Sequence, residues 1–340
     1  MNDLLIGLLS ALVATNPPGA VSNFVQQKTG LRVAIADVND PVEQAYQKLM
    51  ADDDAAQAEV DEWIKERNKS SVPQMDVEKA TLNGRIKRRF QPVIKGYDDF
   101  LIAHPQHVNA RIAYGSFLND IGEEDSAEAQ WKKASEIDPK NPAPWNNLAN
   151  HYGHNGDVKK AFDYYAKAME LEPEEPVYVQ NLATTIFLFR QDAMEHYKIS
   201  EQQVFARAMG LYRKALSLAP DSFALAAELA QTYYGIKPPK LADTNATRAA
   251  EMKLGDEALA AWQAAQKLSN NELEREGIHL HLARWQINLG RYAEARASLA
   301  SITNEPWVTT KKTLTRKLEG REGSAAGTNA PPPLTVPPAP

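Results

Sequence analysis

Residues 142–175 read PAPWNNLANHYGHNGDVKKAFDYYAKAMELEPEE, and this stretch decides the fold. Pro142 suits the first position of a helix, where the missing N–H of proline costs no hydrogen bond. Gly156 breaks that helix, and Pro173 ends a second one. Apolar residues fall on one stripe of each segment, as in an amphipathic helix that packs against a neighbour. The stretch therefore predicts a pair of antiparallel helices joined by a tight turn.

The preceding residues, 108–141, repeat this pattern at a shift of 34 positions. The residues that match between the two stretches are Gly115, Gly122, Ala127, Trp131, Ala134 and Pro139. A 34-residue helix–turn–helix with this order of aromatic, small and proline positions resembles the tetratricopeptide repeat. The resemblance covers roughly residues 97–302 and implies an all-α fold, a right-handed α-solenoid of stacked repeats with a helical N-terminal cap.

Three further repeats follow. Two inserts interrupt them, at residues 190–200 and 236–253, and the sequence does not indicate the role of either insert. The expected organisation is an apolar segment at 1–20, a helical cap at 21–92, a repeat array at 93–303, a terminal helix at 304–322 and a disordered proline-rich tail at 323–340. Within the array we place units near 108–141, 142–175, 176–222, 223–272 and 273–303. In the cap, residues 40–69 are expected to form a helical hairpin, with Asp52, Asp53 and Asp54 at a turn.

The N-terminal run from Leu4 to Ala14 leaves two interpretations open. It would reach about 16 Å as a helix, against about 30 Å for a membrane core, so it does not predict a span. It fits either the apolar part of a signal peptide or a short docked helix. Asp3 and the lack of Lys or Arg before the run slightly favour the docked helix and a cytoplasmic location, with export to the periplasm as the alternative.

Composition and motifs argue against several function classes. The chain has 38 Lys and Arg against 44 Asp and Glu, so it lacks the basic excess typical of nucleic-acid binding. It has no cysteine, which excludes disulfides and thiolate chemistry. The sequence contains no nucleophile elbow, phosphate-binding loop or zinc-protease motif. His151 and His154 are interpreted as a solvated helix end, so we expect no enzyme, no cofactor and no metal site.

The tetratricopeptide resemblance implies a concave groove that is lined by the first helix of each unit and binds an extended peptide or a partner helix. The residues at its inward positions are Asn146, Asn147, Asn150, Gln180, Asn181, Thr184, Gln231, Tyr234 and Arg284. Asn147 and Asn181 share one repeat position and should form an amide ladder, which can pair with any peptide main chain. Only Arg284 of this set is a cation, so the set does not predict a site for a terminal carboxylate.

Two function classes remain in view. The first is a non-enzymatic scaffold that binds a protein or peptide partner in the groove. The second is an accessory subunit of a cell-envelope assembly or modification complex whose chemistry lies on a partner.

The aromatic residues of the second helices are expected in the core; they are Trp131, Tyr165, Tyr212 and Trp262.

Overall fold

The computed structural model describes residues 40–69, 76–238 and 241–327, and every regular element in these ranges is an α-helix. The chain divides into two compact units, residues 1–156 and residues 157–340. The expected apolar run at Leu4 to Ala14 and residues 328–340 of the expected tail lie outside the described residues. The prediction of a disordered tail from residue 323 is wrong for residues 323–327, which continue the last helix. None of the described helices is both long enough and apolar enough to cross a membrane.

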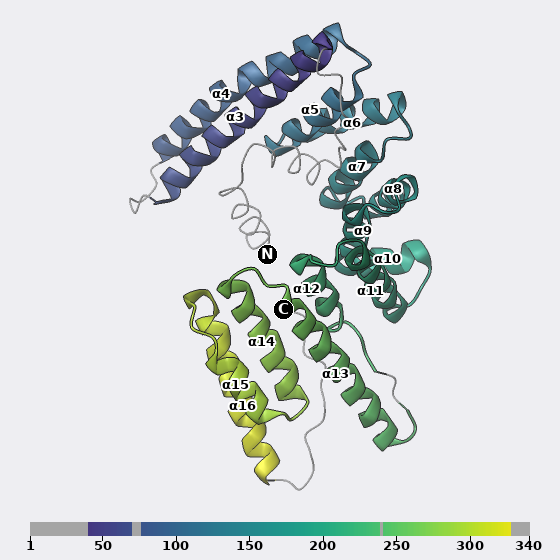
Figure 1. Cartoon of the computed structure of the whole chain (residues 1–340), viewed down its shortest axis with the longest axis vertical. Coiled ribbons are helices and arrows are strands. Elements are labelled where there is room, and N and C mark those ends of the chain that lie inside the picture. The colour runs from purple at the N-terminus through teal and green to yellow at the C-terminus, as the bar shows by residue number, and fades with distance from the viewer. Residues whose placement is uncertain (1–39, 70–75, 239–240, 328–340) are drawn as a thin grey trace. The chain divides into compact units, whose positions relative to one another are not determined.

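The first two described helices of unit 1 are long and lie side by side (Figure 1). The described helices of this unit are α3 (Pro41–Lys69), α4 (Asp76–Ala103), α5 (Val108–Asp120), α6 (Glu124–Ile137) and α7 (Pro142–His154). The prediction of a hairpin over residues 40–69 is wrong, because α3 runs unbroken through the three aspartates. Asp53 is buried in this helix and accepts a hydrogen bond from the Tyr97 hydroxyl on α4, at 2.6 Å. Since α4 continues past residue 92, the predicted boundary between cap and array falls inside a helix.

A repeat in unit 1 is built by the close crossing of α5 and α6. Gly115 faces the indole of Trp131, which is 3% exposed and donates through Nε1 to the Ile112 carbonyl at 3.2 Å. Gly122 turns the chain between the two helices with a φ of +82°, a conformation that side chains disfavour. The glycine that stands 34 residues later, Gly156, has a φ of +91°. The repeated pattern therefore places the turns as predicted.

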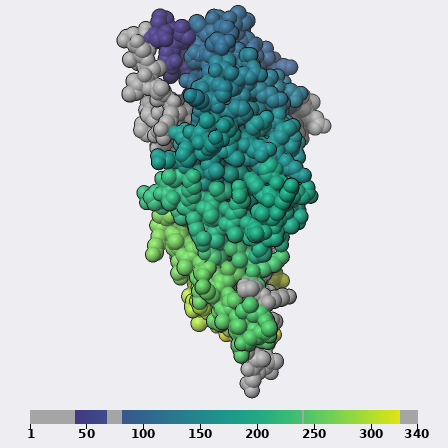
Figure 2. Space-filling view, turned by 90° about the vertical axis from the view of Figure 1, so that its right-hand side faces the viewer, coloured from purple at the N-terminus to yellow at the C-terminus, as the bar shows by residue number. Residues whose placement is uncertain are grey.

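Unit 2 contains the remaining described helices, which are coloured from teal to yellow in Figure 2. They are α8 (Val158–Leu171), α9 (Pro176–Leu188), α10 (Arg190–Tyr197), α11 (Glu201–Leu218), α12 (Phe223–Thr232), α13 (Thr244–Lys267), α14 (Glu272–Asn288), α15 (Tyr292–Ala300) and α16 (Glu305–Gly327). The insert near 190–200 forms the extra helix α10. Ser200 and Gln203 then make the capping box that starts α11. The second insert, 236–253, supplies a loop and the first turns of α13.

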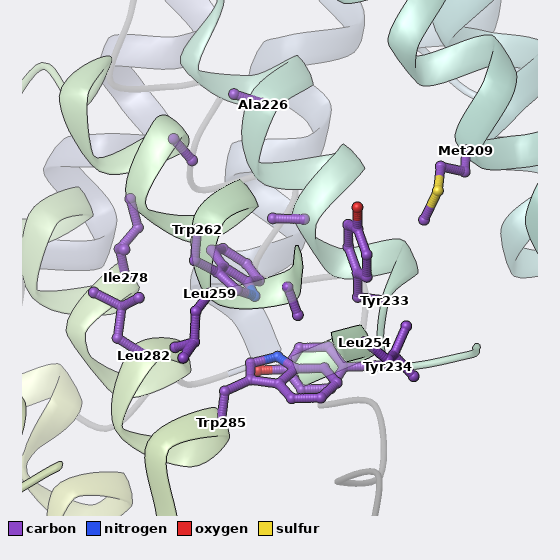
Figure 3. Packing of buried hydrophobic residues seen from close by; sticks show 13 residues of the cluster. Met209, Ala226, Tyr233, Tyr234, Leu254, Leu259, Trp262, Ile278, Leu282 and Trp285 are labelled. Carbon is purple, nitrogen blue, oxygen red and sulfur yellow. The ribbon is translucent and has the colours of Figure 1, made fainter. Parts of the chain in front are cut away.

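The core of unit 2 is rich in aromatic side chains. The predicted packing residues Tyr165, Tyr212 and Trp262 are all at most 4% exposed. Figure 3 shows the cluster around Trp262, to which α11, α12, α13 and α14 each contribute. The helices of unit 2 thus bury their apolar faces against their neighbours in sequence, as expected for a repeat fold.

Candidate binding face

The predicted site residues of unit 1 lie on α7. Asn146 and Asn147 are buried, at 2% and 4% exposure, and Asn150 is half-buried. The Asn147 amide nitrogen lies 3.5 Å from the Ser116 hydroxyl on α5, to which it donates. Asn181, the expected ladder partner of Asn147, belongs to unit 2, so the amide ladder stays a prediction.

The prediction of a solvated histidine pair at the end of α7 is wrong for one of its members. His154 is exposed, but His151 is only 7% exposed. Its ring packs edge-on to Trp131, and the Asn155 side chain lies within hydrogen-bond distance. His151 is therefore a packed residue of unit 1. Among the described residues, no three metal-binding side chains of the His, Cys, Asp and Glu types come together.

In unit 2 the predicted residues of α9 are half-buried and engaged in hydrogen bonds. The Gln180 amide donates to Glu228 on α12 at 3.0 Å, and this bond joins the first helices of two successive repeats. The Thr184 hydroxyl lies 2.9 Å from the Tyr212 hydroxyl on α11. Asn181 is half-buried beside them. The residues predicted from the repeat register on α9 thus form a polar, partly exposed row.

Sequence reasoning missed Glu228, although the insert length points to it. The third unit is 47 residues long from Pro173 to Pro220 (220 − 173), and Glu228 lies the same 47 residues after Asn181 (228 − 181). Burial raises the pKa of the Glu228 carboxyl to about 7, and the hydrogen bond from Gln180 opposes this shift. The Glu228 carboxyl therefore titrates near neutral pH. It can donate a hydrogen bond through its O–H when it is protonated, and it only accepts hydrogen bonds when it is ionised.

Tyr234 is predicted as a groove residue, but the structure places it in the aromatic core, at 5% exposure. Its hydroxyl pairs with Nδ1 of His281 on α14 at 2.8 Å, and its ring stacks on Trp285 with centroids 5.3 Å apart (Figure 3). The His281 ring in turn stacks on Trp262, with centroids 3.9 Å apart. Burial, and to a smaller degree the cation of Arg284, lower the pKa of His281 to about 3, so this histidine is neutral at pH 7.

Gln231 and Arg284 complete the predicted set, and both are half-buried. The Arg284 guanidinium lies over the Tyr234 ring, 5.8 Å from its centroid. The residues at the predicted inward positions of α9, α12 and α14 therefore offer amides and one guanidinium, to which Glu228 adds a titratable carboxyl. Such groups bind and orient a polar chain through hydrogen bonds.

Comparison with known proteins agrees with the repeat pattern. The tetratricopeptide repeat family matches at residues 142–175. The Photosystem I assembly protein Ycf3 of Cyanophora paradoxa is 31% identical over 78 residues, which are 23% of this chain and 45% of that protein. The chain thus spans less than half the length of this curated relative.

Two solved structures of low sequence identity have a similar arrangement of helices. YrrB, described as a TPR protein with an unusual peptide-binding site, is 15% identical, covers 65% of this chain and 97% of its own, and gives a TM-score of 0.48. PilF of Pseudomonas aeruginosa is 18% identical, covers 64% of this chain and 87% of its own, and gives a TM-score of 0.44. Neither likeness carries information about function. The match at residues 142–175, together with the 34-residue register and the helical pairs that follow it, shows that the chain contains tetratricopeptide repeats.

Proposed function

We propose that this protein is a non-enzymatic interaction scaffold and that the face formed by α9, α12 and α14 binds an extended peptide or a helix of a partner protein. Tetratricopeptide repeats are generally interaction scaffolds, and this supports a protein partner. The observation that carries the proposal is the half-buried polar row at the predicted inward positions, in particular Gln180, Asn181 and Thr184.

The chemistry of the row suits main-chain recognition. A side-chain amide offers both donors and an acceptor, so it can pair with a peptide unit whatever side chains the peptide carries. The packed core of unit 2 fixes the helices that present these groups, so little backbone entropy is lost on binding. Specificity then comes from neighbouring charged groups, of which Glu228 and Arg284 are the candidates in unit 2.

A random-peptide display selection on the purified full chain tests this proposal. Selected peptides should bind the wild type, and the double variant Asn181→Ala, Gln231→Ala should lose about tenfold or more in affinity by fluorescence anisotropy. The matched control is Lys214→Ala, an exposed position on α11, which should bind like the wild type. If the double variant keeps its fold and binds every selected peptide as tightly as the wild type, the face is not the binding site.

A second candidate is favoured by the match to Ycf3, whose name describes an assembly protein. According to this second candidate, the chain holds together components of a larger complex, such as one of the cell envelope, and those partners carry out any chemical reaction. Chemical cross-linking of the native complex, followed by peptide mapping, separates the two candidates. Cross-links from two different proteins to one copy of the chain support an assembly role, and a single partner supports a simple adaptor.

A further inference from the structure

The described residues include three glycines at which the chain turns between two helices with a positive φ. They are Gly122, Gly156 and Gly290, with φ values of +82°, +91° and +76°. The N–H of Gly122 donates to the Asn119 carbonyl at 3.0 Å, and the N–H of Gly290 donates to the Ile287 carbonyl at 3.2 Å. In each of these two turns the next residue adds a second backbone hydrogen bond, at 2.8 Å. Together the two bonds make the closed turn that commonly ends a helix.

The turn at Gly156 lacks both of these bonds. Within the described part of the chain, the N–H groups of Gly156 and Asp157 donate to no backbone carbonyl. Gly156 is exposed to solvent, and so is Asn155, the residue before it. The peptide group between Asn155 and Gly156 can therefore rotate at the cost of a small local opening, and water reaches it from outside.

An asparagine that is followed by glycine carries an electrophile next to a nucleophile. The backbone nitrogen of the glycine can attack the side-chain carbonyl carbon, Cγ, and close a five-membered ring, and glycine has no side chain to obstruct this approach. The sequence contains two such pairs, Asn83–Gly84 and Asn155–Gly156. Asn83 and Gly84 lie inside α4, where the helical hydrogen bonds hold each backbone N–H. The structure thus separates two pairs that look alike in the sequence.

We propose that the turn at Asn155 and Gly156 is a site of spontaneous deamidation and isoaspartate formation. The Gly156 nitrogen forms a bond to Cγ of Asn155, and the bond from Cγ to Nδ2 breaks. The proton of the Gly156 N–H passes through water to the leaving nitrogen, so ammonia is released. The inference is independent of the proposed binding function, because it needs no partner.

A water molecule then opens the ring at one of its two carbonyl carbons. Opening at Cγ leaves an aspartate with the original main chain. Opening at the main-chain carbonyl of Asn155 leaves an isoaspartate, in which the main chain runs through Cγ. In both cases the chain gains water, loses ammonia and exchanges an amide for a carboxylate, with no oxidation or reduction.

The product carries a negative charge where the fold disfavours one. Position 155 directly follows the last residue of α7, and the C-terminal end of a helix favours cations over anions. The isoaspartate also lengthens the main chain by one carbon atom at a tight turn. Deamidation therefore weakens the end of α7, the helix that carries Asn146 and Asn147.

Ageing of the folded full-length chain in mildly alkaline buffer tests the site, with tryptic digestion and liquid chromatography–mass spectrometry as the readout. Asn155 should deamidate about tenfold or more faster than Asn83, because α4 must open locally before Gly84 can react. Both aspartate and isoaspartate should appear at position 155. The matched variant is Asn155→Gln, which keeps the amide but cannot close the five-membered ring, and it should show no deamidation at this position.

A parallel incubation in denaturing urea separates the effect of the fold from that of the neighbouring residues. The difference between Asn155 and Asn83 should disappear there, since neither the turn nor α4 is formed. Equal rates in the folded chain would overturn the proposal, because the open turn would then confer no reactivity. A difference that persists in urea would assign the reactivity to the local sequence instead. Aspartate without isoaspartate would mean that water hydrolyses the amide directly, without attack by Gly156.

Discussion

Gly115→Ala should destabilise unit 1, because the added methyl group meets the ring of Trp131. A Cβ at position 115 would lie 2.4 Å from Nε1 and 2.7 Å from Cδ1 of that ring. Both distances are far below van der Waals contact, so the indole must move. Trp131 is 3% exposed and its N–H is held by the Ile112 carbonyl, so the movement breaks a buried hydrogen bond.

The expected loss is about 2 kcal/mol. Overpacking a well-packed core costs roughly 1–3 kcal/mol, and a lost buried hydrogen bond adds about 1 kcal/mol. The higher helix propensity of alanine than of glycine stabilises the folded state by about 1 kcal/mol and offsets part of this loss. Gly84→Ala is the matched control in the same unit, since a Cβ there on α4 meets nothing within 4 Å. That variant should be more stable than the wild type by about 0.5–1 kcal/mol.

Urea unfolding, followed by tryptophan fluorescence and far-ultraviolet circular dichroism, measures both variants. The reasoning predicts opposite signs for the same chemical change at two helical positions. If Gly115→Ala is as stable as the wild type, or gains as much as Gly84→Ala, then α5 and α6 do not cross at Gly115. The 34-residue register, which places a small residue at that crossing, would then be wrong.

Three further variants test other parts of the structure. The raised pKa of Glu228 means that the folded chain keeps a proton between about pH 4.5 and 7 that the unfolded chain releases, so stability falls as the pH rises through this window. Glu228→Gln should remove this fall and gain about 2 kcal/mol relative to the wild type at pH 8, as measured by urea unfolding at pH 5 and pH 8. Tyr97→Phe removes a donor from the buried Asp53 carboxyl and should cost about 1–3 kcal/mol in the same assay. Backbone and side-chain donors, Thr303 among them, lower the pKa of Glu276 to about 2 despite its burial, so its contribution is present above about pH 4.5 and is lost as the pH falls through about 2. Thermal melts across this acid range should therefore show a flatter pH dependence for Glu276→Gln than for the wild type.

The parts of the fold that the sequence predicts are those that repeat. Gly122 and Gly156 stand 34 residues apart, and both adopt the left-handed conformation that ends a first helix. Trp131 and Tyr165 share this spacing, and both are buried. A repeat unit meets its neighbour through the same positions each time, so one well-matched stretch carries information about the next.

The sequence predicts less where a contact has no repeat behind it. The three aspartates of α3 look like a turn because like charges disfavour a helix interior, yet Asp53 is held by Tyr97, which lies 44 residues away. Tyr234 sits at a groove position of the register, but its hydroxyl reaches His281 and its ring reaches Trp285. In both cases a long-range hydrogen bond decides the outcome, and local pattern does not report it.

Buried polar groups among the described residues separate into two kinds, those with hydrogen-bond partners and those without. Asp53 accepts from Tyr97 and Gln57, and Glu276 accepts from the backbone N–H groups of Thr303 and Asn304. These carboxyls tie helices to neighbouring segments, so the fold itself accounts for their burial. Asn288 is buried to the same degree and makes no hydrogen bond. Burial of this amide is therefore a cost that the packing of the surrounding apolar side chains offsets.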